Sequence, residues 1–290
     1  MLWFNNVLPA LLPFIVAVNM LTALGFTKMV SSWIAPIMGF VFNLPGAAGF
    51  ALITGLISGY PMGAKTVADI WHDGEISTKE AQRLLAFCNN AGPLFIVGVV
   101  GIGILGNASA GYMLWIGHVV AALIIGFLTR GNVRAYGDRT HNQRKHEIRG
   151  IIRSDSINIG KTLGDAVKNA MEALVVVGGL IIFFSVVVRA VTIIVVGSLP
   201  FFANTPFIGI IAGLIEVTGG VKLLGDLPSA LSPARMAAIG GLIAFGGFSV
   251  HAQALHFTAG TGIKAGTYVL SKALHGAVAA GVTWVLCLQL

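Results

Sequence analysis

The polar side chains that could bind a small molecule stand where glycine or proline interrupts an apolar run. Asn89 and Asn90 come directly before such an interruption, Ala91-Gly92-Pro93. Their amides can donate to a carboxylate or accept from a hydroxyl. The alternative is that they only cap their own broken helix, but paired asparagines facing lipid are costly unless they have partners. We therefore expect Asn89 and Asn90 to contact a solute.

A second polar group lies at an interruption in the other half of the chain. Gly246 and Gly247 break an apolar run and are followed by Ser249, His251 and Gln253. We expect these five residues to line the same solute site. His251 could also carry a proton, although a lone histidine more often makes a structural hydrogen bond.

The segment Ser58-Gly59-Tyr60-Pro61 has the composition of a tight turn inside an apolar stretch. Ser58, Gly59 and Tyr60 could touch a solute, or they could simply hold the turn while Pro61 sets its shape. The sequence supports the two roles equally.

Glu216 is the single acidic residue in the apolar run 205–224. An ionisable group at membrane depth is a functional candidate by default. We predict that Glu216, with Thr218 beside it, binds a coupling Na⁺ or carries a coupling H⁺. The alternative is a structural ion pair with Lys222 or Arg189.

The sequence lacks common motifs of enzymes and metal sites. It contains no G-x-x-x-x-G-K-[ST] loop, no H-E-x-x-H pair and no convincing G-x-S-x-G elbow. Cys88 and Cys287 stand in separate apolar segments and suggest neither a disulfide nor a metal site. We expect no enzymatic activity and no resident cofactor. An intramembrane enzyme would need paired catalytic groups at one depth, for which Glu216 and His251 are the candidates.

The composition places most of the chain in lipid. Of 290 residues, 56% are hydrophobic and 10% are charged, and the mean hydropathy is +0.87. The formal charge of +7 does not indicate nucleic acid, because eight of the 18 Lys and Arg residues fall in one polar loop, residues 130–161. Such a loop marks the cytoplasmic side of a membrane protein. The expected partners are a small solute, membrane lipid and a second copy of the chain in a homo-oligomer.

Windows of about 20 apolar residues predict six full-length membrane spans. They lie at 9–29, 81–105, 111–129, 173–196, 234–257 and 266–288. The stretch 154–174 mixes charged and apolar residues, and we expect it to lie along the interface before turning into the fourth span.

Two further apolar stretches, 46–71 and 206–224, are broken in the middle and predict re-entrant hairpins. The first breaks around Ser58–Gly63 and the second around Thr218–Gly220. Irregular backbone at membrane depth occurs only where it is buried in protein or lines a wet cavity. Gly-Leu-Ile-Ser at 55–58 has its counterpart in Gly-Leu-Ile-Glu at 213–216.

The order of the parts recurs, which predicts an all-α polytopic fold made of two inverted repeats. Each repeat has a span, a short linking segment, a hairpin, a broken span and a span. The first repeat is 1–129, the basic linker 130–160 and the second repeat 161–290. Three spans per repeat invert the second copy, with both chain ends outside. The positive-inside rule supports this orientation, since seven basic residues fall near predicted cytoplasmic ends: Lys28, Lys65, Lys79, Arg83, Lys168, Lys264 and Lys272.

Three strings resemble the nucleoside-recognition (Gate) domain family. They are Gly-Tyr-Pro-Met-Gly-Ala-Lys at 59–65, the run 83–96 around Phe-Cys-Asn-Asn-Ala-Gly-Pro, and Phe-Gly-Gly-Phe-Ser-Val-His-Ala-Gln at 245–253. Within that family the chain is similar to sporulation membrane proteins of the YlbJ type. The resemblance extends over nearly the whole chain. It implies a fold related to concentrative nucleoside transporters and, for the sporulation members, movement of dipicolinate across the outer forespore membrane.

Interrupted helices and hairpins around a midplane site are typical of alternating-access transporters. We therefore expect a multi-pass protein of the bacterial cytoplasmic or outer forespore membrane that acts as a secondary transporter or facilitator. Dipicolinate or a similar small carboxylate is the first-choice solute, since anions suit helix N-termini. The alternatives are a nucleoside or nucleobase carrier, and a membrane module that senses a solute or assists assembly without transport.

Overall fold

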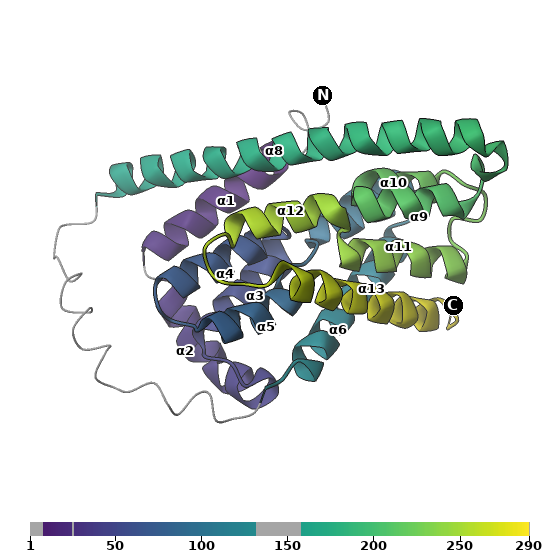
Figure 1. The fold of residues 1–290 in the computed structure, drawn as a ribbon. Helices are drawn as coiled ribbons and strands as arrows, with labels where there is room; N and C mark the ends of the chain where they lie inside the picture. Colours follow the sequence, from purple (N-terminus) through teal and green to yellow (C-terminus); the bar gives the residue numbers. More distant parts are fainter. Residues whose placement is uncertain (1–7, 25, 132–157, 290) are drawn as a thin grey trace.

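The structure is a computed structural model that describes residues 8–24, 26–131 and 158–289, where all regular elements are helices (Figure 1). Four of these helices are long and apolar enough to cross a membrane, or up to five if the bent pair Met29–Phe42 and Ala47–Ser58 counts as one span. The four are Ala108–Leu128, Ile159–Ser198, Pro233–Phe257 and Ala265–Cys287. The predicted all-α polytopic fold is confirmed. The inversion of the two halves and their orientation in the membrane stay predictions, and most of the linker 130–160 lies outside the described residues.

The first half begins differently from the prediction. The expected span 9–29 is divided into α1 (Leu8–Ala23) and α2 (Phe26–Ile37). A π-helical turn, Met38–Phe42, continues α2, so the expected linking segment is helical. The apolar sequence continues past residue 29, and Met38 and Phe42 are buried in the core. Helix packing therefore extends to the bend before α3.

The first hairpin has the predicted form. Helix α3 (Ala47–Ser58) and helix α4 (Met62–His72) pack against each other around the break at residues 59–61. Gly59 has a φ of +81° and a ψ of −176°, a conformation that is almost restricted to glycine. The turn-forming residues Gly59 and Pro61 therefore mark this break in the sequence at the position where the structure has it.

The predicted span 81–105 consists of two helices. Helix α5 (Thr78–Cys88) starts at a capping box formed by Ser77 and Glu80. After the break at residues 89–93, the chain continues as a π-helix, Leu94–Ile104, and then as α6 (Ala108–Leu128). Gly-Pro at 92–93 breaks the helix as expected, and the broken helix joins the hairpin and α6.

The second half contains α8 (Ile159–Ser198), a short 3₁₀ turn, and the hairpin α9 (Pro206–Ile215) and α10 (Val217–Gly225). The predicted break at Thr218–Gly220 is wrong, because the chain breaks at Glu216. Gly220 lies inside α10, where its Cα faces Gly213 so closely that a Cβ would overlap the backbone. These glycines serve close helix packing. Helix α11 (Pro233–Phe245), helix α12 (Gly247–Phe257) and helix α13 (Ala265–Cys287) follow.

Helix α8 corrects the predicted interfacial segment. It is a continuous helix of 40 residues, with no turn between the charged stretch and the apolar span. Figure 1 shows it along one side of the molecule, where it contacts α1, α12 and α9. The residues around 172 favour a helix and include no proline or glycine, so nothing in the chain interrupts it there.

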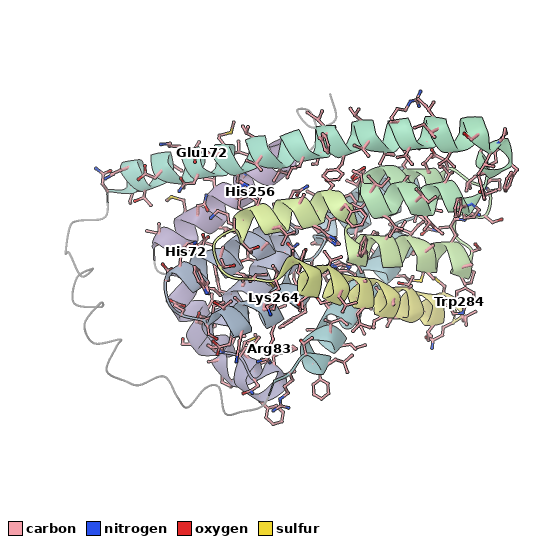
Figure 2. All side chains as sticks on the ribbon, in the orientation of Figure 1. His72, Arg83, Glu172, His256, Lys264 and Trp284 are labelled. Atoms are coloured by element: carbon pink, nitrogen blue, oxygen red, sulfur yellow. The ribbon has the colours of Figure 1, made fainter. Side chains whose placement is uncertain are left out.

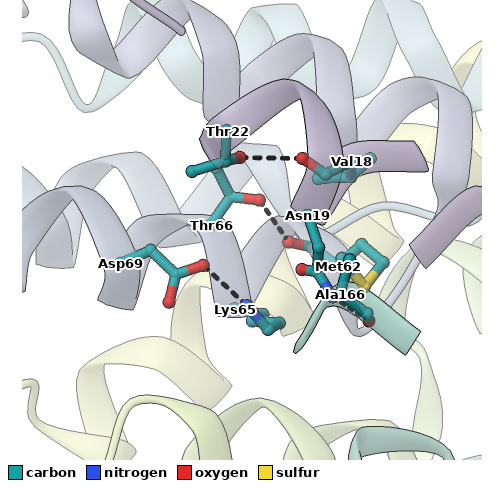
Figure 3. Close-up of polar contacts among 8 residues, drawn as sticks. All are labelled: Val18, Asn19, Thr22, Met62, Lys65, Thr66, Asp69 and Ala166. Atoms are coloured by element: carbon teal, nitrogen blue, oxygen red, sulfur yellow. Dashed lines mark hydrogen bonds and ion pairs between the residues drawn. The ribbon is translucent and has the colours of Figure 1, made fainter. Parts of the chain in front are cut away.

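One hydrogen bond attaches the first half to α8 (Figure 3). The Asn19 side-chain amide donates to the Ala166 carbonyl at 3.1 Å. On α4, Lys65 forms an ion pair with Asp69 at 2.8 Å. An apolar cluster also joins α1 and α4 to α8, and it contains Ile15, Met62, Ala170 and Leu174.

Helix α13 belongs to the second half and packs against helices of both halves. It packs against α11, α6 and α5. One face of α13 is buried, and this face carries Tyr268, Lys272, His275, Ala279 and Thr283. The same helix face therefore meets both broken helices.

Candidate functional site

Each hairpin break packs against the break of its own half. A Cβ on Gly59 would lie 2.7 Å from the backbone N of Gly92. In the second half, a Cβ on Gly247 would lie 2.8 Å from the Gly213 carbonyl oxygen and 3.2 Å from that of Ile215. The four irregular segments are thus paired backbone to backbone, which glycine alone permits at this separation.

Asn89 ends α5 and lies fully buried. Its Nδ2 donates to the Tyr268 hydroxyl at 2.8 Å, while its Oδ1 has no hydrogen-bond partner among the described residues. A phenol can both donate and accept, so the amide could present either its oxygen or its nitrogen to a solute.

Asn90 is also fully buried and donates from Nδ2 to the Phe87 carbonyl at 2.7 Å. This bond is the capping role that the sequence left as the alternative. Its Oδ1 finds no partner in the described part of the chain. Asn90 therefore caps its helix with one end of the amide and leaves an acceptor at the other.

Lys272 is buried inside the protein. The sequence places it near a predicted cytoplasmic end, which stays a prediction, and the residue is only 1% exposed. Its Nζ donates to the Asn89 carbonyl at 2.9 Å and lies 2.8 Å from His275 Nδ1. The interior position follows from helix geometry, because Lys272 shares the buried face of α13 with Tyr268 and His275.

Two histidines extend this hydrogen-bonded chain. His275 Nε2 lies 3.3 Å from the His118 carbonyl, and the backbone N of Ala91 donates to His118 Nε2 at 3.2 Å. Since the lysine ammonium has only donors, His275 accepts at Nδ1 and carries its proton on Nε2. His118 accepts at Nε2 and carries its proton on Nδ1. The hydrogen-bond partners of His118 and His275 are thus those of neutral imidazole rings.

The second polar group reaches the same region through His251. His251 Nε2 lies 2.8 Å from the Phe245 carbonyl, and its ring packs edge-on against Tyr268 with centroids 5.3 Å apart. Ser249 and Gln253 are buried and hydrogen-bond to each other at 3.4 Å, a long contact. Tyr268 therefore joins the predicted groups of the two halves.

Glu216 forms a helix cap and not the ion pair considered as its alternative. Its carboxylate accepts from the backbone N–H groups of Thr218 at 2.9 Å and Gly219 at 2.7 Å, at the N-terminus of α10. Lys222 pairs with Asp226 instead. A carboxylate at this position is favoured by the helix dipole. Binding of a coupling ion by Glu216 and Thr218 stays a prediction.

Tyr60 is the polar side chain at the tip of the first hairpin. Its hydroxyl is buried without a hydrogen-bond partner among the described residues. Its ring packs near Phe95, with centroids 6.2 Å apart. Ser58 is half-buried at the end of α3. The tip of the hairpin α3–α4 therefore forms the turn, and it also leaves the Tyr60 hydroxyl without a hydrogen-bond partner among the described residues.

The sequence reasoning missed four buried polar residues: His118, Tyr268, Lys272 and His275. Three of them follow the spacing i, i+4, i+7 on α13, which places them on one helix face. That spacing was the available signal. We call nine residues with buried polar atoms near the breaks and on α6 and α13 the buried polar cluster: Tyr60, Asn89, Asn90, His118, Glu216, His251, Tyr268, Lys272 and His275.

Two cavities open elsewhere on the molecule. One, of about 410 Å³, lies between α4, α8 and α12, where Figure 2 labels Glu172 and His256; Lys65 and Asn169 also line it. The other, of about 290 Å³, lies near Asn107 and Cys287. Within residues 8–24, 26–131 and 158–289, no group of three His, Cys, Asp or Glu residues is placed to share a metal ion.

These features define a multi-pass integral membrane protein with helical hairpins and broken helices around a buried polar cluster. A family model described as "Gate: Nucleoside recognition" matches residues 4–89. The chain is 32% identical to the sporulation integral membrane protein YlbJ of Bacillus subtilis (strain 168), over 96% of this chain and 73% of that protein. It belongs to the YlbJ family of sporulation integral membrane proteins. No solved structure matches.

Proposed function

We propose that this protein is a secondary transporter or facilitator that moves a small anionic solute across its membrane by alternating access. The main support for this proposal is the buried polar cluster. Both halves of the chain contribute residues to it, near the breaks in their helices. Several of its polar atoms lack partners within the described chain: Tyr60 Oη, Asn89 Oδ1, Asn90 Oδ1, His118 Nδ1 and His251 Nδ1. Unpaired buried polar atoms are costly, and a solute that pairs with them recovers that free energy.

The arrangement of the parts supports movement and not only binding. A site at the meeting point of two hairpins and two broken helices can open to either side when one half moves against the other. The inverted relation of the two halves belongs to this proposal. A coupling Na⁺ or H⁺ at Glu216 and Thr218 would supply the driving force.

Dipicolinate or a similar small carboxylate is the first-choice solute. The relative is a sporulation protein by name, and the Lys272 amine lies inside the cluster, where in its protonated form it would pair with a carboxylate. A nucleoside or nucleobase is the second candidate. It is favoured by the description of the matching family model and by the two unpaired amide oxygens, which could accept from ring N–H or ribose hydroxyl groups.

A thermal-shift screen of the purified protein, followed by uptake into proteoliposomes, tests the proposal. At a ligand concentration 100 times Kd, binding stabilises the folded state by about 2.7 kcal/mol, which raises Tm by about 5–10 °C at about 2–4 °C per kcal/mol. Asn89→Ala and Ser249→Ala should lose this shift, while Ser185→Ala on the exposed face of α8 should keep it.

Each outcome has a distinct meaning. Binding with accumulation inside the vesicles supports transport, and a nucleoside shift favours the second candidate. Binding without accumulation would leave a sensing or assembly module. Normal binding by both Asn89→Ala and Ser249→Ala would remove these residues from the site.

A further inference from the structure

We propose that Lys272 is the fixed positive charge that selects an anionic solute, and that a solute carboxylate replaces the Asn89 carbonyl as its partner. The inference rests on the proposed function and assigns the charge selectivity of the site to one residue on α13.

The Lys272 ammonium is held inside the protein. The residue is 1% exposed and lies seven positions after Ala265, the first residue of α13. Its two contacts, to Asn89 O and His275 Nδ1, fix Nζ against the end of α5. A lysine near a membrane interface would extend its side chain to water, and Lys272 does not.

No carboxylate in the described ranges lies within salt-bridge distance of Lys272. In the same ranges, Lys65 forms an ion pair with Asp69, and Lys222 forms one with Asp226. Glu216 uses both of its oxygens at the N-terminus of α10. The ammonium therefore has hydrogen-bond acceptors but no full counter-charge within the described structure.

The groups around the ammonium supply only part of the missing negative charge. Asn89 lies at the C-terminus of α5, which carries about half an elementary charge of negative sign. His275 and His118 have the hydrogen-bond partners of neutral rings, so neither neutralises the ammonium, and His275 is the ring that contacts it. About half a positive charge is left for a ligand to balance.

A carboxylate is the acceptor that the remaining donors call for. An ammonium has three N–H groups, and two of them are directed at Asn89 O and His275 Nδ1. His118 Nδ1 and the Tyr60 hydroxyl are buried without partners within the described chain and can also donate. When a carboxylate takes the place of the Asn89 carbonyl, Lys272 releases the end of α5, so solute binding acts directly on the break at residues 89–93.

Two probes of nearly the same shape test the charge preference: pyridine-2,6-dicarboxylate and its uncharged diamide, pyridine-2,6-dicarboxamide. Binding of each to the purified full chain is measured by titration calorimetry in detergent. We expect the wild type to prefer the dicarboxylate at least tenfold. Lys272→Met should reduce dicarboxylate affinity at least tenfold and leave the diamide unchanged, whereas Lys272→Arg should retain part of the preference.

Lys222→Met is the matched control, because it removes an exposed lysine of α10 and should change neither affinity. An unchanged preference in Lys272→Met would overturn the inference. If the Lys272 variants do not fold, the wild type alone decides, since equal affinity for the two probes, or no binding of the dicarboxylate, also overturns it. Charge-selective binding without proteoliposome uptake would refute the proposed transport and leave the role of Lys272 intact.

Discussion

Replacing Gly247 by alanine should destabilise the contact between the two breaks of the second half. Gly247 has a φ of +71°, and a Cβ there would lie 2.8 Å from the Gly213 carbonyl oxygen and 3.2 Å from both Ile215 O and Val217 N. The left-handed conformation costs an alanine about 1–2 kcal/mol. The overlap adds about 1–3 kcal/mol, because the neighbouring atoms belong to the backbone and cannot rotate away.

Gly260→Ala separates the two effects. Gly260 has a φ of +81° but nothing within 4 Å of its Cβ position, so this variant should lose only the conformational part. Thermal unfolding of both proteins in the same detergent measures the difference. At about 2–4 °C per kcal/mol, Gly247→Ala should melt at least 2 °C below Gly260→Ala. Equal melting temperatures would refute the close contact between the break at residue 246 and the hairpin α9–α10.

Three further substitutions test other contacts. Glu216→Ala should lose about 0.5–2 kcal/mol as an N-cap, and Glu216→Gln should lose less because it keeps an acceptor; equal losses in thermal unfolding would argue against the cap. Arg83→Lys should lower Tm, because the guanidinium donates to three backbone carbonyls that one ammonium cannot reach together; an unchanged Tm would contradict this. Gly101→Ala should destabilise through its approach to Gly111, 2.5 Å from Cβ to Cα, whereas Gly103→Ala, whose nearest neighbour is at 3.5 Å, should be tolerated, and equal effects would count against this packing.

The breaks of the fold could largely be read from the sequence, because the residues that stop helices act locally. Gly59-Tyr60-Pro61, Gly92-Pro93 and Gly246-Gly247 all interrupt helices where expected. The glycine pair at 219–220 misled the prediction, since glycine also occurs where helices pack closely. Only tertiary contacts distinguish the two uses, and Gly220 lies against Gly213.

The candidate site was harder to predict because burial is a property of the whole fold. Asn89 and His251 could be predicted, because each lies near the glycine or proline that breaks its helix. The prediction for Lys272 uses only its distance from the end of a predicted span. That distance does not specify whether the side chain points into the protein. The spacing of Tyr268, Lys272 and His275 on one helix face would have shown it.

Helix α8 combines two kinds of surface in one rigid rod. At 1.5 Å per residue, its 40 residues extend about 60 Å, twice the hydrocarbon thickness of about 30 Å. The charged residues Lys161, Asp165, Lys168 and Glu172 occupy its first third, and exposed apolar side chains such as Ile182, Phe183 and Ile193 follow. The helix is therefore about 30 Å longer than one crossing of the hydrocarbon layer, and its charged first third continues into the apolar part without a break. Because no break separates the two parts, a force on the charged end would tilt the apolar length with it.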